Sequence, residues 1–506
     1  MSIFKKLRKA FSHPHPLEQP RYDVPVSAAE LKEIFSECAD FESRKIAVGG
    51  DSSGLVTICY IDGVIDSTAV SEDVIRPLTT PGRVPPVAGS ARCMELIKRG
   101  AVYCNNVSLK ETMDEVVEAV AKGFCLIIFD KENAALAFET RSSVQRSISE
   151  PTMEKAIKGS KDAFVERLRT NTMLVRRKLQ TPKLKSIRTV IGRESGTELS
   201  VMYVDGIVDP VTVGELLKRL DDIDIDGLLA AGNLIEYISE SPSTPFPQAL
   251  LTERPDRFAI NLLEGRVGII IDGLPLAVML PGTLAEMMRV PEDRAQHFLV
   301  ASFLRMLRYI AAIISVVFPA LYVATSMYHQ EMIPVKLLLS IIESKQQVPF
   351  STAVEIIAML LAFEVLQEAG LRLPSSIGET VSIIGALIVG QSAVEAKVVS
   401  PFAVLVVAIA GITGYTVPNQ DLGVALRLCR LMLVFFALLA GMYGIMIGLV
   451  LIIYHMCSIE SFGVSYLSPL TDGNALGVFS MMLRPPLYKN KMREPDLNTP
   501  NKRNQR

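Results

Sequence analysis

Charged residues are unevenly spread along the chain, and this divides it into two parts. The first 300 residues carry charge at the density of an ordinary globular protein, whereas residues 309–454 contain long uncharged stretches. Three of these stretches, residues 309–327, 398–418 and 431–454, reach the length of about 20 apolar residues that a helix needs to cross a bilayer. The pattern predicts an α-helical polytopic membrane domain over residues 300–460, preceded by a water-facing region.

Two further apolar segments are less regular. Residues 350–367 contain Glu355 and Glu364 and form a fourth predicted span. Residues 381–394 are too short to cross a bilayer comfortably, so we interpret them as a re-entrant or short tilted piece.

Basic residues beside the spans predict their orientation. Arg305 and Arg308 precede the first span, and six lysines and arginines follow the last one, within residues 489–506. Because positively charged flanks stay on the cytoplasmic side, we expect both termini in the cytoplasm, which requires an even number of crossings. Four spans fit this rule. Arg427 and Arg430 conflict with it, since the four-span arrangement puts them near the outer face.

The water-facing part contains a repeated pattern. Residues 60–66 read YIDGVID and residues 203–209 read YVDGIVD, 143 residues later, and residues 111–130 match residues 253–272 at an offset of 142. In both copies a strand-like run precedes the motif and a helix-like run follows it. Near-constant offsets indicate a tandem duplication. The predicted fold is therefore a cytoplasmic region of two tandem repeated α/β units, followed by the helical membrane domain.

Predicted domain boundaries follow from this division. A disordered N-terminal arm covers residues 1–27, and the two α/β subdomains cover residues 28–144 and 172–290. Between them, residues 145–171 are a linker helix region. The run of residues 146–179 has a helical pattern and many basic residues, and it is either a solvated helix or a docking surface near lipid headgroups. Residues 461–506 are a predicted cytoplasmic tail.

Each copy of the repeated motif carries an Asp-Gly pair and a second aspartate. Glycine tolerates positive φ and aspartate bonds its own backbone, so residues 62–63 and 205–206 predict turns. Asp66 and Asp209 are these second aspartates. A pair of aspartates could bind a cation, but nothing else nearby in the sequence supplies ligands. We therefore favour these aspartates as N-caps of the helices that follow them.

Composition and missing motifs exclude several functions. A net charge of -2 over 506 residues gives no case for a nucleic-acid partner. The seven cysteines include no C-x-x-C pair and the five histidines are scattered, which predicts buried reduced thiols and no metal site. The chain has no phosphate-loop, zinc-protease, hydrolase or dinucleotide motif, so we expect no enzyme activity and no cofactor. Its basic N-terminus lacks the apolar core of a signal peptide, which places the first half in the cytoplasm.

Four segments resemble one known family. Residues 146–179 (RSISEPTMEKAIKGSKDAFVERLRTNTMLVRRKL) and 245–281 (PFPQALLTERPDRFAINLLEGRVGIIIDGLPLAVMLP) resemble signature segments of the GerA family of spore germination proteins. Residues 363–401 (FEVLQEAGLRLPSSIGETVSIIGALIVGQSAVEAKVVSP) are similar to its membrane region, and residues 461–470 (SFGVSYLSPL) to its C-terminal motif. Together the matching segments cover most of residues 145–470.

The resemblance implies a function and partners. Within the family the chain is most similar to the A subunit of a nutrient germinant receptor, and the SFGVSYLSP ending favours this over a stage V sporulation AF-type accessory protein. It implies a place in the spore inner membrane, in contact with membrane lipids, and a complex with a transporter-like B subunit and a lipoprotein C subunit. It also implies self-oligomerisation into a nutrient-gated channel, which we expect to conduct monovalent cations. A secondary transporter stays open as an alternative, although such a protein would show paired broken helices.

The fourth predicted span is the most polar one, so we expect it to line the pore, because ions need polar or small groups in place of lost water. At about 100° per residue, Glu355, Met359, Ala362 and Leu366 fall on one stripe of this helix. Glu364 lies half a turn from Glu355, so the two carboxylates cannot face one axis. We expect Glu355 on the axis and Glu364 against a neighbouring helix; the alternative is that both are solvated near the interfaces.

Three glycines recur in the last predicted span. Gly441, Gly444 and Gly448 include one G-x-x-x-G spacing, which is typical of a helix-packing face. Ordinary glycine use in a membrane helix is the alternative interpretation.

Overall fold

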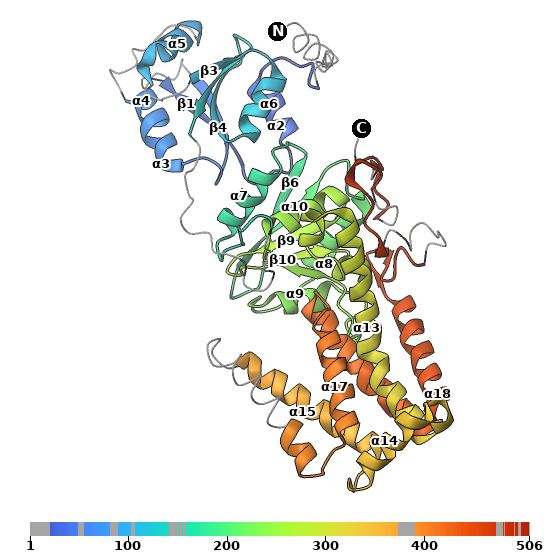
Figure 1. Ribbon diagram of the computed structural model, residues 1–506. Helices are drawn as coiled ribbons and strands as arrows, with labels where there is room; N and C mark the ends of the chain where they lie inside the picture. The colour runs from blue at the N-terminus through green and yellow to red at the C-terminus, as the bar shows by residue number, and fades with distance from the viewer. Residues whose placement is uncertain are drawn as a thin grey trace, which may run out of the picture.

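The computed structural model describes residues 21–48, 55–80, 90–102, 107–140, 158–372 and 390–471, together with residues 151, 154, 479, 481–489, 491–493 and 497–504. Three parts follow one another in space: a first α/β unit, a second α/β unit and a region of long helices (Figure 1). The predicted N-terminal arm and the predicted short segment at 381–394 lie largely outside the described residues.

Each α/β unit is built on a five-stranded antiparallel sheet. The first sheet has the strand order β1-β2-β4-β5-β3, and its strands are β1 (Phe41–Ala47), β2 (Leu55–Ile61), β3 (Val107–Lys110), β4 (Phe124–Phe129) and β5 (Ala134–Glu139). The second sheet has the order β6-β7-β9-β10-β8, and its strands are β6 (Leu184–Ile191), β7 (Thr197–Val204), β8 (Leu250–Thr252), β9 (Val267–Ile271) and β10 (Ala277–Leu280). The two orders correspond strand by strand, as a tandem duplication requires.

Helices cover both faces of each sheet, so each unit has three layers. In the first unit α2 (Ala28–Ile34) and α6 (Met113–Ala121) pack on one face, and a succession of short helices packs on the other: α3 (Ser67–Ala69), the π-helix η2 (Val70–Ile75), α4 (Arg76–Thr79), α5 (Ser90–Leu96) and the π-helix η3 (Ile97–Ala101). In the second unit α7 (Leu168–Lys178) and α10 (Pro255–Glu264) lie opposite α8 (Pro210–Asp221) and α9 (Ala231–Ile238). Along β9, Ile269 and Ile271 enter one core and Ile270 the other, which is the period of two of a strand buried on both faces.

The repeated aspartates do what the sequence predicts. Asp66 accepts hydrogen bonds from Thr68 N and Ala69 N at the start of α3, and Asp209 accepts one from Val211 N at the start of α8. Both aspartates are therefore confirmed as N-caps. The preceding turns contain Gly63 and Gly206 at φ of 85° and 74°, a conformation that glycine adopts without steric cost.

Helix α7 joins the two units. It packs within the second unit, and Arg176 donates from Nε and Nη2 to both carboxylate oxygens of Asp40 in the first, at 2.7 and 2.8 Å. Arg169, at the start of α7, donates to Asp62 Oδ1 and Ser67 Oγ, also of the first unit. Helix α7 is therefore only partly solvated, because Arg176 is 2% exposed whereas Arg177 and Lys178 are exposed; docking to lipid headgroups stays a prediction. The predicted boundary at residue 171 falls inside this helix.

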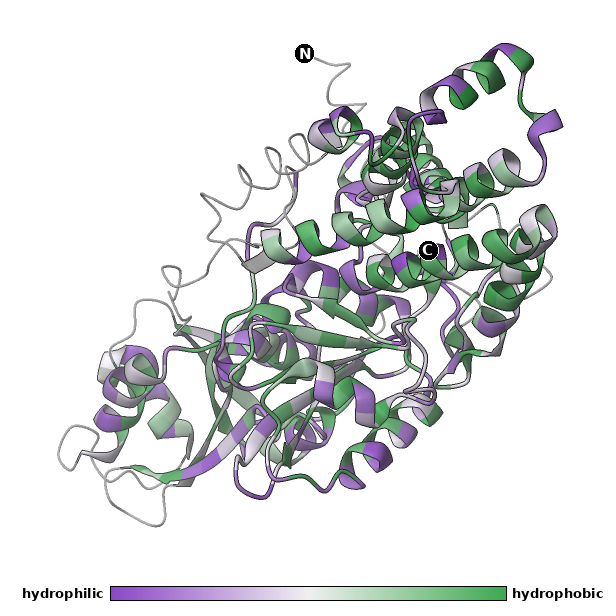
Figure 2. Ribbon diagram, turned by 90° about the horizontal axis from the view of Figure 1, so that it is seen from below, coloured by the Kyte–Doolittle hydropathy of each residue, from purple (hydrophilic) through white to green (hydrophobic). Residues whose placement is uncertain are grey.

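The helical region follows two short helices, α11 (Leu284–Met287) and α12 (Glu292–Ala295). Its elements are α13 (Phe298–Met327), the 3-10 helix η4 (Gln330–Met332), α14 (Val335–Lys345), α15 (Thr352–Arg372), α17 (Pro401–Gly414) and α18 (Gln420–Ser458). Among the described residues, α13 and α18 are long and apolar enough to cross a membrane. Hydrophobic residues dominate these helices, whereas hydrophilic residues are frequent on the helices of the α/β units (Figure 2).

Two of the predicted spans differ from the structure. The stretch 398–418 forms only the 14 residues of α17, about 21 Å of helix, because Ser400 caps its start and Pro418 follows its end. The stretch 431–454 is not one straight span, because α18 breaks at Ala440 and Gly441, where Gly441 has φ 58° and ψ -131°. A Cβ at Gly448 would meet Leu433, 15 residues earlier, so the second half of α18 folds back along the first.

The chain after α18 returns to the second α/β unit. A short hairpin of β11 (Glu460–Ser461) and β12 (Val464–Ser465) lies there, and Ser461 Oγ donates to Gln248 O at 3.1 Å. Leu284 N donates to Tyr466 O at 2.9 Å, just before the start of α13. The C-terminal end of α18 and the N-terminal end of α13 are therefore held by the same unit (Figure 1). A last 3-10 helix, η5, covers Leu487–Lys489.

Candidate functional site

Helix α15 carries the two carboxylates of the predicted pore helix. One face of α15 is buried against α13, α17 and α18, with Ala353, Ile356 and Leu360 at 0% exposure. The opposite side exposes Leu361 and Val365, which are 51% and 70% exposed. The helix thus has one face inside its own chain and one face available to lipid or to another chain.

Glu355 points into the helical region of its own chain. Its side chain is 0% exposed, and Oε2 accepts a hydrogen bond of 2.8 Å from Ser400 N at the start of α17. Lys345 Nζ, at the end of α14, lies 3.3 Å from Oε1. Glu355 therefore links α15 to the start of α17 and to the end of α14.

Glu364 faces a different set of partners. Arg430 Nη2 donates to Oε1 at 2.6 Å and Arg427 Nη1 donates to Oε2 at 2.9 Å, both from the first half of α18. Arg427 also donates to Gln367, one turn along α15. Two guanidinium groups around one carboxylate leave one net positive charge in this cluster. The two arginines that conflict with the four-span prediction are therefore ion-pair partners of α15.

The predicted pore stripe spans both faces of α15. Glu355 is buried, Met359 and Leu366 are half-buried, and Ala362 is exposed. Glu355 and Glu364 bind different neighbouring helices, α17 and α18. Pore lining by Glu355, Met359, Ala362 and Leu366 stays a prediction.

The three glycines of α18 lie at the fold-back between its two halves. A Cβ at Gly444 would overlap the carbonyl oxygen of Phe436, and a Cβ at Gly448 would lie 2.5 Å from Leu433 Cδ2. Gly441 occupies the break itself, with the ring of Tyr328 packed against it. Each of these positions therefore has little or no room for a side chain.

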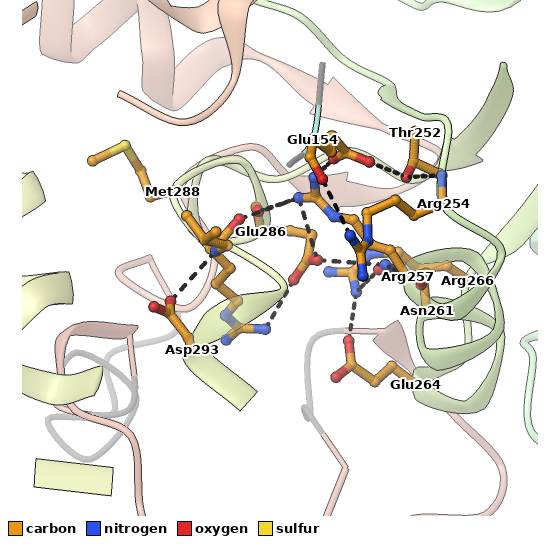
Figure 3. Close-up of polar contacts among 12 residues, drawn as sticks. Glu154, Thr252, Arg254, Arg257, Asn261, Glu264, Arg266, Glu286, Met288 and Asp293 are labelled. Atoms are coloured by element: carbon orange, nitrogen blue, oxygen red, sulfur yellow. Dashed lines mark hydrogen bonds and ion pairs between the residues drawn. The ribbon is translucent and has the colours of Figure 1, made fainter. Parts of the chain in front are cut away.

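A cluster of buried charges at the junction of the second α/β unit and α13 was missed by the sequence analysis (Figure 3). Asp293, in α12, pairs with Arg308 of α13, while Arg289 Nη1 donates to Glu286 Oε2 at 3.1 Å. Burial alone would raise the pKa of Glu286, but four surrounding guanidinium groups lower it below its ordinary value; these belong to Arg266, Arg289, Arg257 and Arg294. The sequence signal is the run of charges from residue 286 to 308, of which only Arg305 and Arg308 enter the prediction of orientation.

No group of three or more His, Cys, Asp or Glu side chains is arranged to hold a metal ion within the part of the chain that the structure describes. The described residues form paired α/β units, two helices able to span a bilayer, and ion pairs among the helices, which is the organisation of a membrane protein.

Comparisons with known proteins identify the class. The family model described as Bacillus/Clostridium GerA spore germination protein matches residues 29–496. Spore germination protein KA of Bacillus subtilis (strain 168) is 35% identical over 92% of this chain and 85% of its own length. Stage V sporulation protein AF of the same organism is 31% identical over 74% of this chain and 76% of its own length. The chain belongs to the GerA family of spore germination proteins.

A solved structure is also similar to part of this chain. The N-terminal domain of the A subunit of the Bacillus megaterium spore germinant receptor GerK3 is 30% identical, with a TM-score of 0.39, and the match covers 50% of this chain and 92% of that domain.

Proposed function

We propose that this protein is the A subunit of a spore germinant receptor, and that copies of it assemble into a nutrient-gated ion channel. One observation carries the assignment within the family. The similarity to Spore germination protein KA extends over 92% of the chain at 35% identity, whereas the similarity to stage V sporulation protein AF extends over 74% at 31%.

The ion pathway is proposed to run along α15, where copies of the chain meet. Ala362 is exposed, and the half-buried Met359 and Leu366 lie on the same stripe, so these three positions are available to a neighbouring chain. Glu355 binds the start of α17 in the present arrangement. It would reach the pathway only when α15 separates from α17, which makes this contact a candidate gate.

The partners and location belong to the same proposal. A transporter-like B subunit would sense the nutrient, a lipoprotein C subunit would complete the complex, and monovalent cations would pass through the channel. The location is the spore inner membrane with both termini on the core side. In support, both ends of the long-helix region attach to the second α/β unit, which requires an even number of crossings between them.

Removal of the gene tests the assignment. Spores that lack a receptor A subunit should lose their response to one set of nutrients and keep their response to others. A uniform slowing with every nutrient would instead support an AF-type accessory role. Purified complex in planar bilayers then separates a channel from a secondary transporter, because a channel gives ohmic current and a transporter gives saturable flux.

Substitutions on α15 test the pathway. Met359→Ala or Leu366→Ala should widen the stripe and release cations from spores without nutrient, and Glu355→Gln should change cation conductance. Leu361→Ala is the matched control, since it removes the same kind of side chain from a face outside the stripe. If spores with the stripe variants release no cations without nutrient, or if the Leu361→Ala control releases as much as they do, α15 does not line the pathway.

A further inference from the structure

The junction between the second α/β unit and α13 contains a partly open cavity of about 40 Å³. It lies among α10, α11, α12 and the first turns of α13, in the region shown in Figure 3. Four arginines line this cavity: Arg257, Arg289, Arg294 and Arg305. Three carboxylates line it as well, so the lining carries one net positive charge.

Each of these carboxylates already binds an arginine. Asp256 accepts from Arg254 Nη2 at 2.8 Å, Glu286 accepts from Arg289, and Asp293 accepts from Arg308. Arg257 and Arg294 have partners of their own, since they bind Glu154 and Glu264. The charges that line the cavity are thus largely satisfied, with one exception.

Arg305 is the exception. It is only 6% exposed, and Nη2 lies 3.5 Å from Asp293 Oδ2, a carboxylate that Arg308 already binds. Arg305 Nε is buried and has no hydrogen-bond partner among the described residues. A buried guanidinium with an unused donor is costly, and a second anion within reach would compensate it.

The position of Arg305 relates the cavity to the membrane surface. Arg305 lies one turn before the uncharged stretch that begins at Tyr309, and other sides of the same helix expose Leu299, Phe303 and Leu307. The cavity therefore lies beside the start of the stretch predicted to span the membrane, where anionic lipid headgroups are expected.

We propose that this cavity binds a phosphate group, with Arg305 as its principal ligand and Arg289 beside it. A guanidinium matches the geometry of phosphate oxygens and donates two hydrogen bonds to them. The phosphate belongs either to the headgroup of an anionic phospholipid or to free inorganic phosphate, since both present the same oxygens. The site would hold the second α/β unit at a fixed position relative to α13.

Binding to the purified full-length chain tests the proposal. One arm titrates inorganic phosphate into detergent-solubilised protein. The other measures by native mass spectrometry the retention of phosphatidylglycerol, with phosphatidylcholine as competitor. Whichever of the two measurements detects binding to the wild-type protein, we expect Arg305→Gln to weaken that binding at least about tenfold, because it removes a charged hydrogen bond. Arg193→Gln is the matched control: Arg193 is exposed and pairs with Asp224, far from the cavity in sequence.

A second variant keeps the proposal falsifiable if Arg305→Gln does not fold. Val290 lines the cavity, so Val290→Phe should fill it without changing any charge and should weaken binding to the same degree. Binding of inorganic phosphate identifies a soluble ligand, and selective retention of phosphatidylglycerol identifies a lipid. The proposal is overturned if wild-type protein binds neither, or if Val290→Phe binds as well as the Arg193→Gln control. The measurement uses neither nutrient nor ion flux, so its failure leaves the receptor assignment untouched.

Discussion

The buried ion pair between the two α/β units allows a quantitative prediction. Asp40 and Arg176 have side chains that are 3% and 2% exposed, and they form two parallel hydrogen bonds. Asp40→Asn removes the negative charge and leaves the buried guanidinium uncompensated. Such losses cost about 3–5 kcal/mol. Because asparagine keeps one oxygen acceptor, we take the lower end, about 3 kcal/mol, which is about a hundredfold in the equilibrium for separating the units.

Amide hydrogen exchange measures this separation directly. Ser186 N, in the second unit, donates to Glu37 O in the first at 3.0 Å, and Ala39 N donates in return to Ser186 O at 2.8 Å. Both amides become exposed only when the units part, so Asp40→Asn should speed their exchange about a hundredfold. Amides within β9, in the centre of the second sheet, should exchange at the wild-type rate.

An exposed ion pair provides the control. Arg193 and Asp224 also form a two-bonded pair, but their side chains are 66% and 64% exposed. Exposed pairs contribute little to stability because solvent screens their charges, so Asp224→Asn should leave the exchange of Ser186 close to that of wild type. If Asp40→Asn and Asp224→Asn speed exchange at Ser186 equally, burial of the Asp40–Arg176 pair does not determine how strongly the two α/β units are held together.

Three further predictions concern the membrane helices and the junction. Glu364→Gln leaves two arginines of α18 without a carboxylate and should destabilise the detergent-solubilised chain by about 3 kcal/mol, whereas the exposed Glu343→Gln should have little effect; equal melting temperatures would contradict this. Gly444→Ala should cost about 2 kcal/mol or more, because the added carbon overlaps Phe436 O, while Gly423→Ala in the same helix meets nothing within 4 Å and should be neutral or stabilising in the same thermal assay. The arginines around Glu286 lower its pKa, so its ionised carboxylate stabilises the fold at any pH above the ordinary pKa range of a glutamate. That contribution should be lost as pH falls below about 4. Glu286→Gln should weaken the loss of stability at acid pH, and an unchanged loss would argue against this assignment.

The sequence predicts the duplicated units well, because duplication leaves a local and repeated signal. The strand-like run, the Asp-Gly turn and the capping aspartate recur at a near-constant offset, and the two sheets have corresponding strand orders. Asp66 and Asp209 could be assigned as caps from sequence because capping depends only on residues two or three positions away.

Features set by contacts between distant segments could not be predicted in this way. The break at Gly441 is hidden inside an uncharged run, because a folded-back pair of helices and one long span have the same hydropathy. Arg430 looked misplaced because its carboxylate partner, Glu364, lies 66 residues away in the chain. Arg176 is a similar case: its basic neighbours in the sequence suggested an exposed helix, but its guanidinium is buried and paired with Asp40.

The attachment of both ends of the long-helix region to one α/β unit has a mechanical consequence. Helix α13 leaves this unit and α18 returns to it, and the two helices pack against each other along the way. A rotation of the second unit therefore turns α13 and α18 together as a single frame. Helix α17 packs extensively on α13 and belongs to this frame, whereas α15 packs on it less extensively, so a torque from the water-facing side would act on the contact between Glu355 of α15 and Ser400 at the start of α17.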